Sequence, residues 1–324
     1  MALALYDNDG QLLTNQLDFN VIVDPQFTAD YNTPNYVYLK GETSLQDYLA
    51  KPEANNLAKT DLDVDLQNGT LKAADDAAKP IVSVNCKSIS ISNGKVTGTG
   101  LNLKAADGVS LSNVEIDGAF AKANSNASVS INTSGDVVVD GVKFTNADAA
   151  ATGRYNGIEI NLGKGYSAKN VTIKNSSFAG LSNNAILVFG MPEEGVVNVE
   201  NCQFDLADGG EALRISNKDN TKHFTVNVKD CNYTYPTTMA EGVKIWYGFF
   251  LFEDNDKPAA TYTDTYKPFS GINIVCDNVT FAGTKVNALN LGTNDHSQFA
   301  CMCYDNCPTY IITDASHFPT FTFK

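Results

Sequence analysis

The sequence predicts an all-β protein built as a parallel β-helix, a solenoid in which each repeat adds strands to the repeat before it. One observation is an eight-residue frame that recurs eight times and is clearest in Val197–Phe204. Its first and third positions are apolar, and its fifth is most often Asn. Successive copies end 20 residues apart at the closest (96 to 116) and 48 at the widest (233 to 281). Self-similarity with a period of about 20–50 residues is typical of solenoids.

A column of Asn residues at the fifth position of the frame predicts a sharp bend in every repeat. The column contains Asn68, Asn93, Asn113, Gly141, Asn175, Asn201, Asp230 and Asn278. Asn, Asp and Gly adopt the left-handed backbone conformation more readily than other residues do. Stacked Asn side chains can also hydrogen-bond one another from repeat to repeat. We therefore expect these residues to be structural.

The last position of the frame predicts a buried column of large side chains. It contains Leu71, Val96, Ile116, Phe144, Phe178, Phe204, Tyr233 and Phe281. The rings of Phe144, Phe178, Phe204 and Tyr233 are expected to form one buried stack, since they share a position in successive repeats. Cys202 and Cys231 share an inward position one residue after the bend and are predicted to be small buried residues.

A second line of short segments runs in step with the frame and supplies the other strands. The segments are 100–103, 127–131, 157–160, 185–188, 212–215, 242–245 and 288–291. Apolar residues occupy alternate positions, which is the period of a β-strand rather than of a helix. The residue between each apolar pair should point outward, which gives a ladder of Asn102, Ser130, Glu159, Leu187, Arg214, Lys244 and Asn290.

On these repeats, the chain resembles the pectin-lyase-like, single-stranded right-handed parallel β-helix superfamily over about Asp61 to Gly292. The superfamily includes pectate lyases, polygalacturonases and the spikes and fibres of bacteriophages. The resemblance implies a right-handed solenoid. It does not decide between these functions, because the shared signal is the repeat itself.

Charge and composition narrow the classes of partner. The net charge is −14, from 23 basic and 37 acidic residues, and such a surface repels the phosphates of nucleic acids. No apolar run is long enough to span a membrane, and the first residues lack the basic region of a signal peptide. The seven cysteines, an odd number, favour folding in a reducing compartment. We expect neither nucleic-acid nor membrane binding.

The frame divides the chain into a head, a body and a cap. Residues 1–60 lack the repeat and are predicted to form a head that closes the open end of the solenoid, docks onto an assembly, or does both, with a short helix near 44–49. Residues 61–292 form the solenoid. Residues 293–324 are predicted to form a C-terminal cap, with strands at 310–312 and 318–323.

An aromatic insert at 246–269 interrupts the last part of the solenoid. A loop this aromatic is expected either to fold back onto the solenoid or to contact a partner, because aromatic residues dominate interface energetics. The residues predicted to contact a partner are Trp246, Tyr247, Phe249, Phe250, Phe252, Tyr262 and Tyr266.

Two groups of residues are candidate metal ligands, and for both we favour a structural interpretation. Cys301, Cys303 and Cys307, with His296 nearby, lack the paired C-x₂-C spacing of zinc sites. Asp61, Asp63 and Asp65 lie on one face of a predicted strand, but the sequence after them does not match a calcium-binding loop. We expect neither a bound metal nor any other cofactor.

The outward ladder carries one enzyme hypothesis. Polysaccharide lyases of the superfamily use a basic residue to remove a proton beside a uronate carboxylate. By this resemblance, Arg214 would act as the base and Lys244 would hold the carboxylate, with Glu159 nearby. The alternative is a salt-bridged surface without chemistry, and the paired carboxylate motifs of polygalacturonases are not found along the repeats.

The interpretation we favour is a structural protein of a bacteriophage virion: a fibre, a spike or a capsid-decorating protein. It would be made in the host cytoplasm without a signal peptide and bind other virion proteins, with contact to host-surface glycans left open. The resemblance implies a homotrimer. The alternatives are a polysaccharide lyase or hydrolase acting on acidic glycans, and a bacterial surface adhesin.

Overall fold

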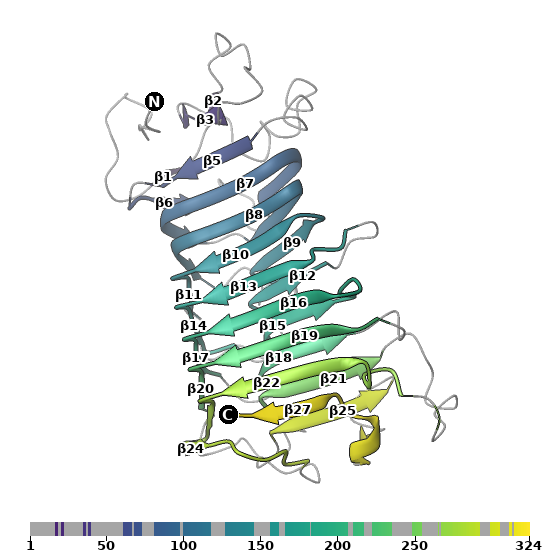
Figure 1. Ribbon diagram of the computed structural model, residues 1–324. Coiled ribbons are helices and arrows are strands. Elements are labelled where there is room, and N and C mark those ends of the chain that lie inside the picture. The colour runs from purple at the N-terminus through teal and green to yellow at the C-terminus, as the bar shows by residue number, and fades with distance from the viewer. Residues whose placement is uncertain are drawn as a thin grey trace.

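The computed structural model describes residues 17–18, 21–22, 35–36, 38–39, 61–66, 68–72, 81–97, 100–117, 127–145, 156–161, 166–181, 183–206, 210–216, 222–234, 248–254, 265, 267–291, 299–304, 311–312 and 314–324. This part of the chain is all-β and is dominated by one long, mostly parallel sheet (Figure 1). Its only helical segment is the 3-10 turn η3 (Ala315–His317).

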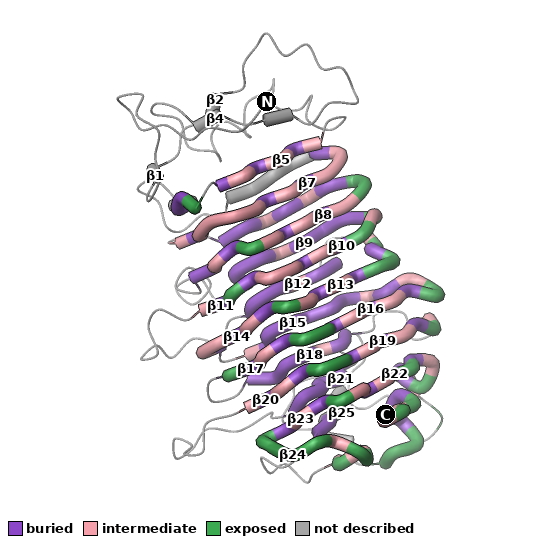
Figure 2. Tube along the Cα trace, turned by 60° about the vertical axis from the view of Figure 1, so that its left-hand side comes forward, coloured by how far each residue is buried: buried purple, intermediate pink, exposed green. Residues whose placement is uncertain are grey.

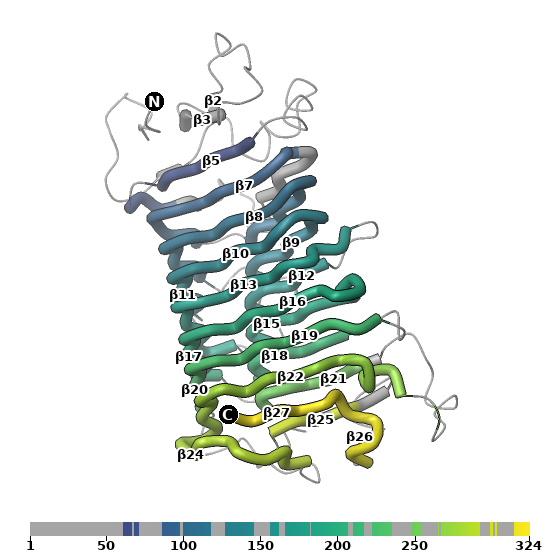
Figure 3. The backbone as a smooth tube through the Cα atoms, in the orientation of Figure 1, coloured from purple at the N-terminus to yellow at the C-terminus, as the bar shows by residue number. Residues whose placement is uncertain are grey.

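The strands pair in three rows, and each repeat of the sequence adds to all three. Row A follows the first half of the frame, and its members lie one above another in Figure 3. Row A consists of β5 (Asp61–Asp65), β7 (Ile81–Thr97), β8 (Leu101–Asp117), β10 (Asp136–Asp140), β13 (Asn170–Lys174), β16 (Gly195–Glu200), β19 (Phe224–Lys229), β22 (Ile272–Asp277) and β27 (Thr320–Phe323).

Rows B and C complete each repeat, and the long strands β7 and β8 contribute to them as well as to row A. The other members of row B are β6 (Thr70–Lys72), β11 (Lys143–Thr145), β14 (Ser177–Ala179), β17 (Gln203–Asp205), β20 (Asn232–Thr234) and β23 (Thr280–Phe281). The other members of row C are β9 (Val129–Thr133), β12 (Ile158–Ile160), β15 (Asn184–Phe189), β18 (Glu211–Ser216), β21 (Phe250–Asp254) and β25 (Ala300–Tyr304).

The predicted bends lie between rows A and B, and the predicted backbone is confirmed at all eight. The φ angles are 65° at Asn68, 57° at Asn93, 54° at Asn113, 67° at Gly141, 52° at Asn175, 50° at Asn201, 53° at Asp230 and 52° at Asn278. The amides also bond from repeat to repeat. Asn201 Nδ2 donates to Asn175 Oδ1 at 2.9 Å, and Asn278 Nδ2 donates to Asp230 Oδ1 at 2.7 Å.

The inner face of row B carries the predicted aromatic column. Phe144 stacks on Phe178 at 4.7 Å between ring centroids, and Phe178 stacks on Phe204 at 5.1 Å. Phe204 and Tyr233 are opposite each other in the strand pairing, and both are fully buried. Phe249 packs against both of these rings, at 5.5 and 6.2 Å. The four predicted rings therefore share one face, and buried positions recur along the strands of every row (Figure 2).

Buried thiols occupy the inward positions predicted for them. Cys202 and Cys231 are free and buried, and each thiol donates to a backbone carbonyl two residues earlier, at 3.3 Å to Glu200 O and 3.2 Å to Lys229 O. Cys276 is also free and buried, and burial raises the pKa of its thiol to about 12. These thiols act as small core side chains.

The predicted register is wrong in the first repeat. Leu62, not Val64, pairs with Ile89, and Val64 pairs with Ile91. The bend and the row B strand β6 that follows it are in the predicted register, since Leu71 pairs with Val96. The first repeat therefore has two more residues between its row A strand and its bend than the frame allows. The carboxylates of this strand bond to the next repeat: Asp61 Oδ1 accepts from Ser88 Oγ at 2.7 Å, and Asp65 Oδ1 accepts from Asn93 Nδ2 at 3.1 Å.

The ladder predicted from the second line is also wrong at its last two positions. Row C continues from β18 to β21 and β25, so Leu251 and Cys301 take the ladder positions predicted for Lys244 and Asn290. Segment 242–245 lies outside the described residues, and 288–291 forms no strand. Phe250-Leu251-Phe252 has the same alternation as the predicted segments, and the burial of all three apolar side chains stabilises β21 in this row. Parallel pairing also continues past residue 292, through β25 and β27.

Both ends of the sheet receive strands from the segments predicted as head and cap. In the head, β1 (Leu17–Asp18) pairs with β6 and β3 (Asn35–Tyr36) pairs with β5, both in parallel. Strands β2 (Val21–Ile22) and β4 (Tyr38–Leu39) form a separate antiparallel pair. The helix predicted near 44–49 lies outside the described residues. At the other end, β26 (Ile311–Ile312) of the predicted cap pairs antiparallel with β25. Strand β24 (Thr284–Lys285), which lies in the predicted solenoid, pairs antiparallel with β23.

The bend column makes a testable prediction at Asn201. Asn201→Ala should lower the free energy of unfolding by about 1–2 kcal/mol, because Ala resists positive φ and cannot bond to Asn175. Asn201→Gly should cost less, since it relieves the backbone strain. The measurement is urea unfolding. Asn227→Ala is the matched control, because it removes an amide bond to Asn198 of the same length, 2.9 Å, from a regular strand. Equal losses for Asn201→Ala and Asn227→Ala would contradict the role assigned to the bend.

Candidate functional site

The outward ladder of row C is where sequence reasoning placed the candidate catalytic residues. The structure pairs Asn102 with Ser130, Ser130 with Glu159, Glu159 with Leu187 and Leu187 with Arg214, as predicted. Glu159 and Arg214 are thus separated by one strand, a backbone distance of about 10 Å. Lys244, the third predicted member, lies outside the described residues.

Arg214 forms an ion pair with Glu253, a residue that sequence reasoning did not connect with it. Glu253 belongs to β21, the neighbouring strand of row C. The two side chains are only 15% and 9% exposed, so the pair is largely removed from water. A buried carboxylate beside a guanidinium favours the protonated form of the guanidinium. This geometry is the opposite of what a proton-abstracting base requires.

Glu159 lies in a polar cluster with amide side chains near the N-terminal ends of the row C strands β12 and β15. Asn156 Nδ2 donates to Glu159 Oε1 at 2.6 Å, and Asn156 Oδ1 accepts from Asn183 Nδ2 at 2.8 Å and Asn184 Nδ2 at 2.9 Å. Burial raises the pKa of the Glu159 carboxyl, while the bond from Asn156 and the charge of Arg214 lower it by less. The cluster is a set of mutually bonded amides around a carboxyl whose pKa is raised by burial.

The chemistry available to this arrangement is limited. It holds one acid with a raised pKa and one arginine already bound to a carboxylate. Leu187 and Leu251 occupy the ladder positions on either side of Arg214, and both are buried. Among the described residues, the site therefore has the character of a packed polar network rather than an open cleft.

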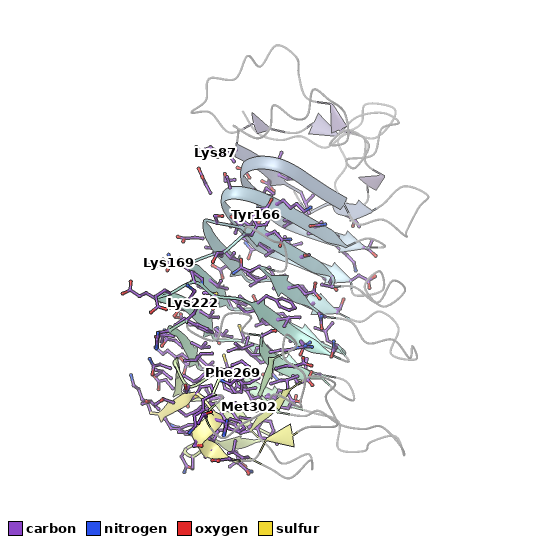
Figure 4. The ribbon with its side chains drawn as sticks, turned by 90° about the vertical axis from the view of Figure 1, so that its right-hand side faces the viewer. Lys87, Tyr166, Lys169, Lys222, Phe269 and Met302 are labelled. Carbon is purple, nitrogen blue, oxygen red and sulfur yellow. The ribbon has the colours of Figure 1, made fainter. Side chains whose placement is uncertain are left out.

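Three of the aromatic residues predicted to contact a partner lie in the core. Phe249, Phe250 and Phe252 are fully buried, as is Phe269 at the end of the predicted insert. Phe252 packs on Phe269 at 5.6 Å, and Figure 4 shows Phe269 in the C-terminal part of the molecule, in the same region as Met302. These rings fold back onto the sheet because they supply the inner face of row C. Trp246, Tyr247, Tyr262 and Tyr266 lie outside the described residues.

The candidate metal ligands do not come together as a site in the part of the chain that the structure describes. Cys301 and Cys303 belong to β25, whereas Cys307 and His296 fall outside the described residues. No group of three or more His, Cys, Asp or Glu residues with metal-binding geometry occurs among the described residues.

Comparison with known proteins gives no relative: no family model, no curated protein and no solved structure matches the chain. Among the described residues, no helix has the length and apolar character needed to cross a membrane.

The ion pair makes a prediction that separates a structural role from a catalytic one. Arg214→Ala should lower the free energy of unfolding by about 3 kcal/mol, because it leaves the Glu253 carboxylate buried without its cation. The double variant Arg214→Leu, Glu253→Leu should regain most of the loss. Lys95→Ala is the control, since its pair with Glu115 is 43% and 40% exposed and should be worth less than about 1 kcal/mol. A stable Arg214→Ala variant would show that the pair contributes little to folding.

Glu159 makes a pH-dependent prediction. A carboxyl whose pKa is raised on folding stabilises the protein fully below its unfolded pKa of about 4.3, and this contribution is lost as the pH rises through the folded pKa. Glu159→Gln stays neutral and should be more stable than the parent by about 1 kcal/mol at pH 7. The difference should vanish near pH 4. Thermal unfolding across this pH range measures it.

Glu200→Gln is the control for this experiment. Glu200 is exposed in β16 and lies between Lys174 and Lys229 in the strand pairing, so neutralising it should not stabilise the protein at pH 7. A loss of stability in Glu159→Gln at neutral pH would contradict the raised pKa.

Proposed function

We propose that the three rows of strands are the three faces of a right-handed parallel β-helix, and that the protein is a structural component of a bacteriophage virion. The parallel register supports the first part. In row A the pairing runs without a break from Leu62 in β5 to Phe321 in β27. Right-handed connection is the rule for parallel strands joined through a crossover.

A stiff shaft is the mechanical role that this arrangement supports. Each inner strand of a row is hydrogen-bonded on both sides, and one apolar core runs through all the repeats. The edge of row A next to the bends adds alternating charge in register: Asp140, Lys174, Glu200, Lys229 and Asp277. Lys174 Nζ lies 3.3 Å from Asp140 Oδ2, and the alternation prevents repulsion between neighbouring strands.

The observation that carries the choice of a structural role over an enzyme is the ion pair between Arg214 and Glu253. It occupies the one arginine that the lyase hypothesis needs as a base. The virion assignment rests in addition on the resemblance to phage spikes and fibres. The buried thiols Cys86, Cys202, Cys231 and Cys276 suit synthesis in a reducing host cytoplasm. Other virion proteins and further copies of the chain, as a homotrimer, are the proposed partners, together with host-surface glycans.

The experiment that tests this proposal locates the protein in phage particles. An antibody raised against recombinant protein should label particles purified by density gradient from a lysed host culture, and electron microscopy of the labelled particles should place it on a fibre, a spike or the capsid surface. Label confined to the bacterial envelope would favour the adhesin instead. Absence from both fractions would contradict a surface or virion role.

An activity assay tests the enzyme alternative separately. Incubation with polyuronates and host capsular glycans should release no unsaturated product. Product that forms with the parent protein but not with Arg214→Lys, in a variant that remains folded, would replace the structural proposal with the lyase.

A further inference from the structure

The column of bend residues has a gap in its side chains at Gly141, which has no side-chain amide to bond to the neighbouring repeats. On the N-terminal side of the gap, Asn113 Nδ2 donates to Asn93 Oδ1 at 3.4 Å. On the C-terminal side of the gap, Asn175 Nδ2 donates to Asp140 Oδ1 at 2.8 Å. Gly141 has the same backbone as its Asn neighbours, with φ of 67°, so the missing side chain changes the surface and not the bend.

A groove of about 420 Å³ lies at this gap, on the outer side of row B. Its polar lining comes from Lys95, Asn113, Glu115 and Lys143, with Gly141 at the open position. A Cβ atom on Gly141 would lie 2.7 Å from Asn113 Oδ1, so glycine keeps this part of the groove clear. The volume falls within the range of about 300–1,000 Å³ typical of small-molecule sites.

The groups in the groove divide into a satisfied pair and two that remain available. Lys95 Nζ bonds to Glu115 Oε1 at 2.7 Å, and this bond raises the pKa of the Lys95 ammonium group. Lys143 is exposed and lies opposite Glu115 in the strand pairing, and it forms no ion pair within the described part of the chain. Asn113 Oδ1 accepts no hydrogen bond from any described residue, so the groove offers one ammonium group beside uncharged and charged acceptors.

These groups specify a chemistry. Lys143 favours an anionic group, and the local excess of one positive charge stands out on a protein of net charge −14. The amide oxygen of Asn113 can accept from a hydroxyl group, and the Glu115 carboxylate can accept a second bond on a lone pair that Lys95 does not use. Glu115 also disfavours a ligand that presents only negative charge. We propose that the groove at Gly141 binds an anionic polyol, a chain or ring of hydroxyl groups that carries one carboxylate or phosphate. This inference does not depend on the proposed virion role.

Ligand-observed NMR and calorimetry on the full-length protein test the proposal. The probes are glucuronate and glycerol 3-phosphate, which present the two anionic groups, with glycerol, acetate and inorganic phosphate as partial ligands. At least one anionic polyol should bind saturably and more tightly than every partial ligand. The anionic group of the tighter probe then identifies the source, a uronate or a phosphopolyol. Binding of phosphate or acetate as tight as that of the polyols would overturn the assigned ligand class.

Two variants locate the binding. Lys143→Gln should weaken it about tenfold, the cost of losing a charge-assisted hydrogen bond. Gly141→Asn should abolish it by filling the gap, and it should fold, because Asn occupies the same bend in the neighbouring repeats. The matched controls are Lys285→Gln, an exposed lysine of β24, and Gly283→Asn, at φ of 78° with open space around it. Unchanged binding in both groove variants, or no binding by the parent, would overturn the proposal.

Discussion

The left-handed bend between rows A and B is the constraint on which the rest of the structure depends. It turns the chain within a single residue, from the outward edge of a row A strand to the buried thiol or apolar residue that opens row B, as at Asn201 and Cys202. Because the turn is so short, from the second repeat onward the bend keeps the row A and row B strands at a fixed spacing, and only the first repeat has two additional residues before it. The aromatic column of row B is in line for this reason, and Phe144, Phe178 and Phe204 stack without any adjustment in the neighbouring strands.

Row C does not follow a bend of fixed length, so the spacing between its strands and the preceding row B strands varies from repeat to repeat. Segments of different length precede its strands in the sequence, and the strands that occupy the row carry buried apolar side chains. The segment beginning at Phe249 is the clearest case, since three of its rings fill the core between row B and the end of the sheet. The same variable spacing brings Glu253 beside Arg214 and converts an outward charge into part of a buried network.

The features that could be predicted from the sequence are those with a local chemical signature. Asn at a fixed place in a short frame reports a backbone conformation directly, and the order Glu159, Leu187, Arg214 followed from alternation within well-matched repeats. The errors arose where two segments had equal alternation and the choice between them depended on distant packing, as with 242–245 and Phe250–Phe252. The first repeat was misregistered because two additional residues precede its bend at Asn68.

The groove illustrates a different limit. Gly141 was in the correct column, but in sequence terms Gly and Asn are equivalent solutions for a left-handed bend. The difference between them appears only when the neighbouring repeats are in place, with Asn113 on one side and Asp140 bonded to Asn175 on the other.

The like-with-like pairing of repeats has a consequence for how such a chain changes length in evolution. Val196 pairs with Thr225 and Val197 with Val226, so a recombination that removes residues 197–225 joins Val196 to a residue equivalent to the one it lost. Every buried column would then remain continuous across the junction. A gene of this kind can lengthen or shorten its product in whole steps of about 4.8 Å, the spacing between neighbouring strands, without redesign of the core.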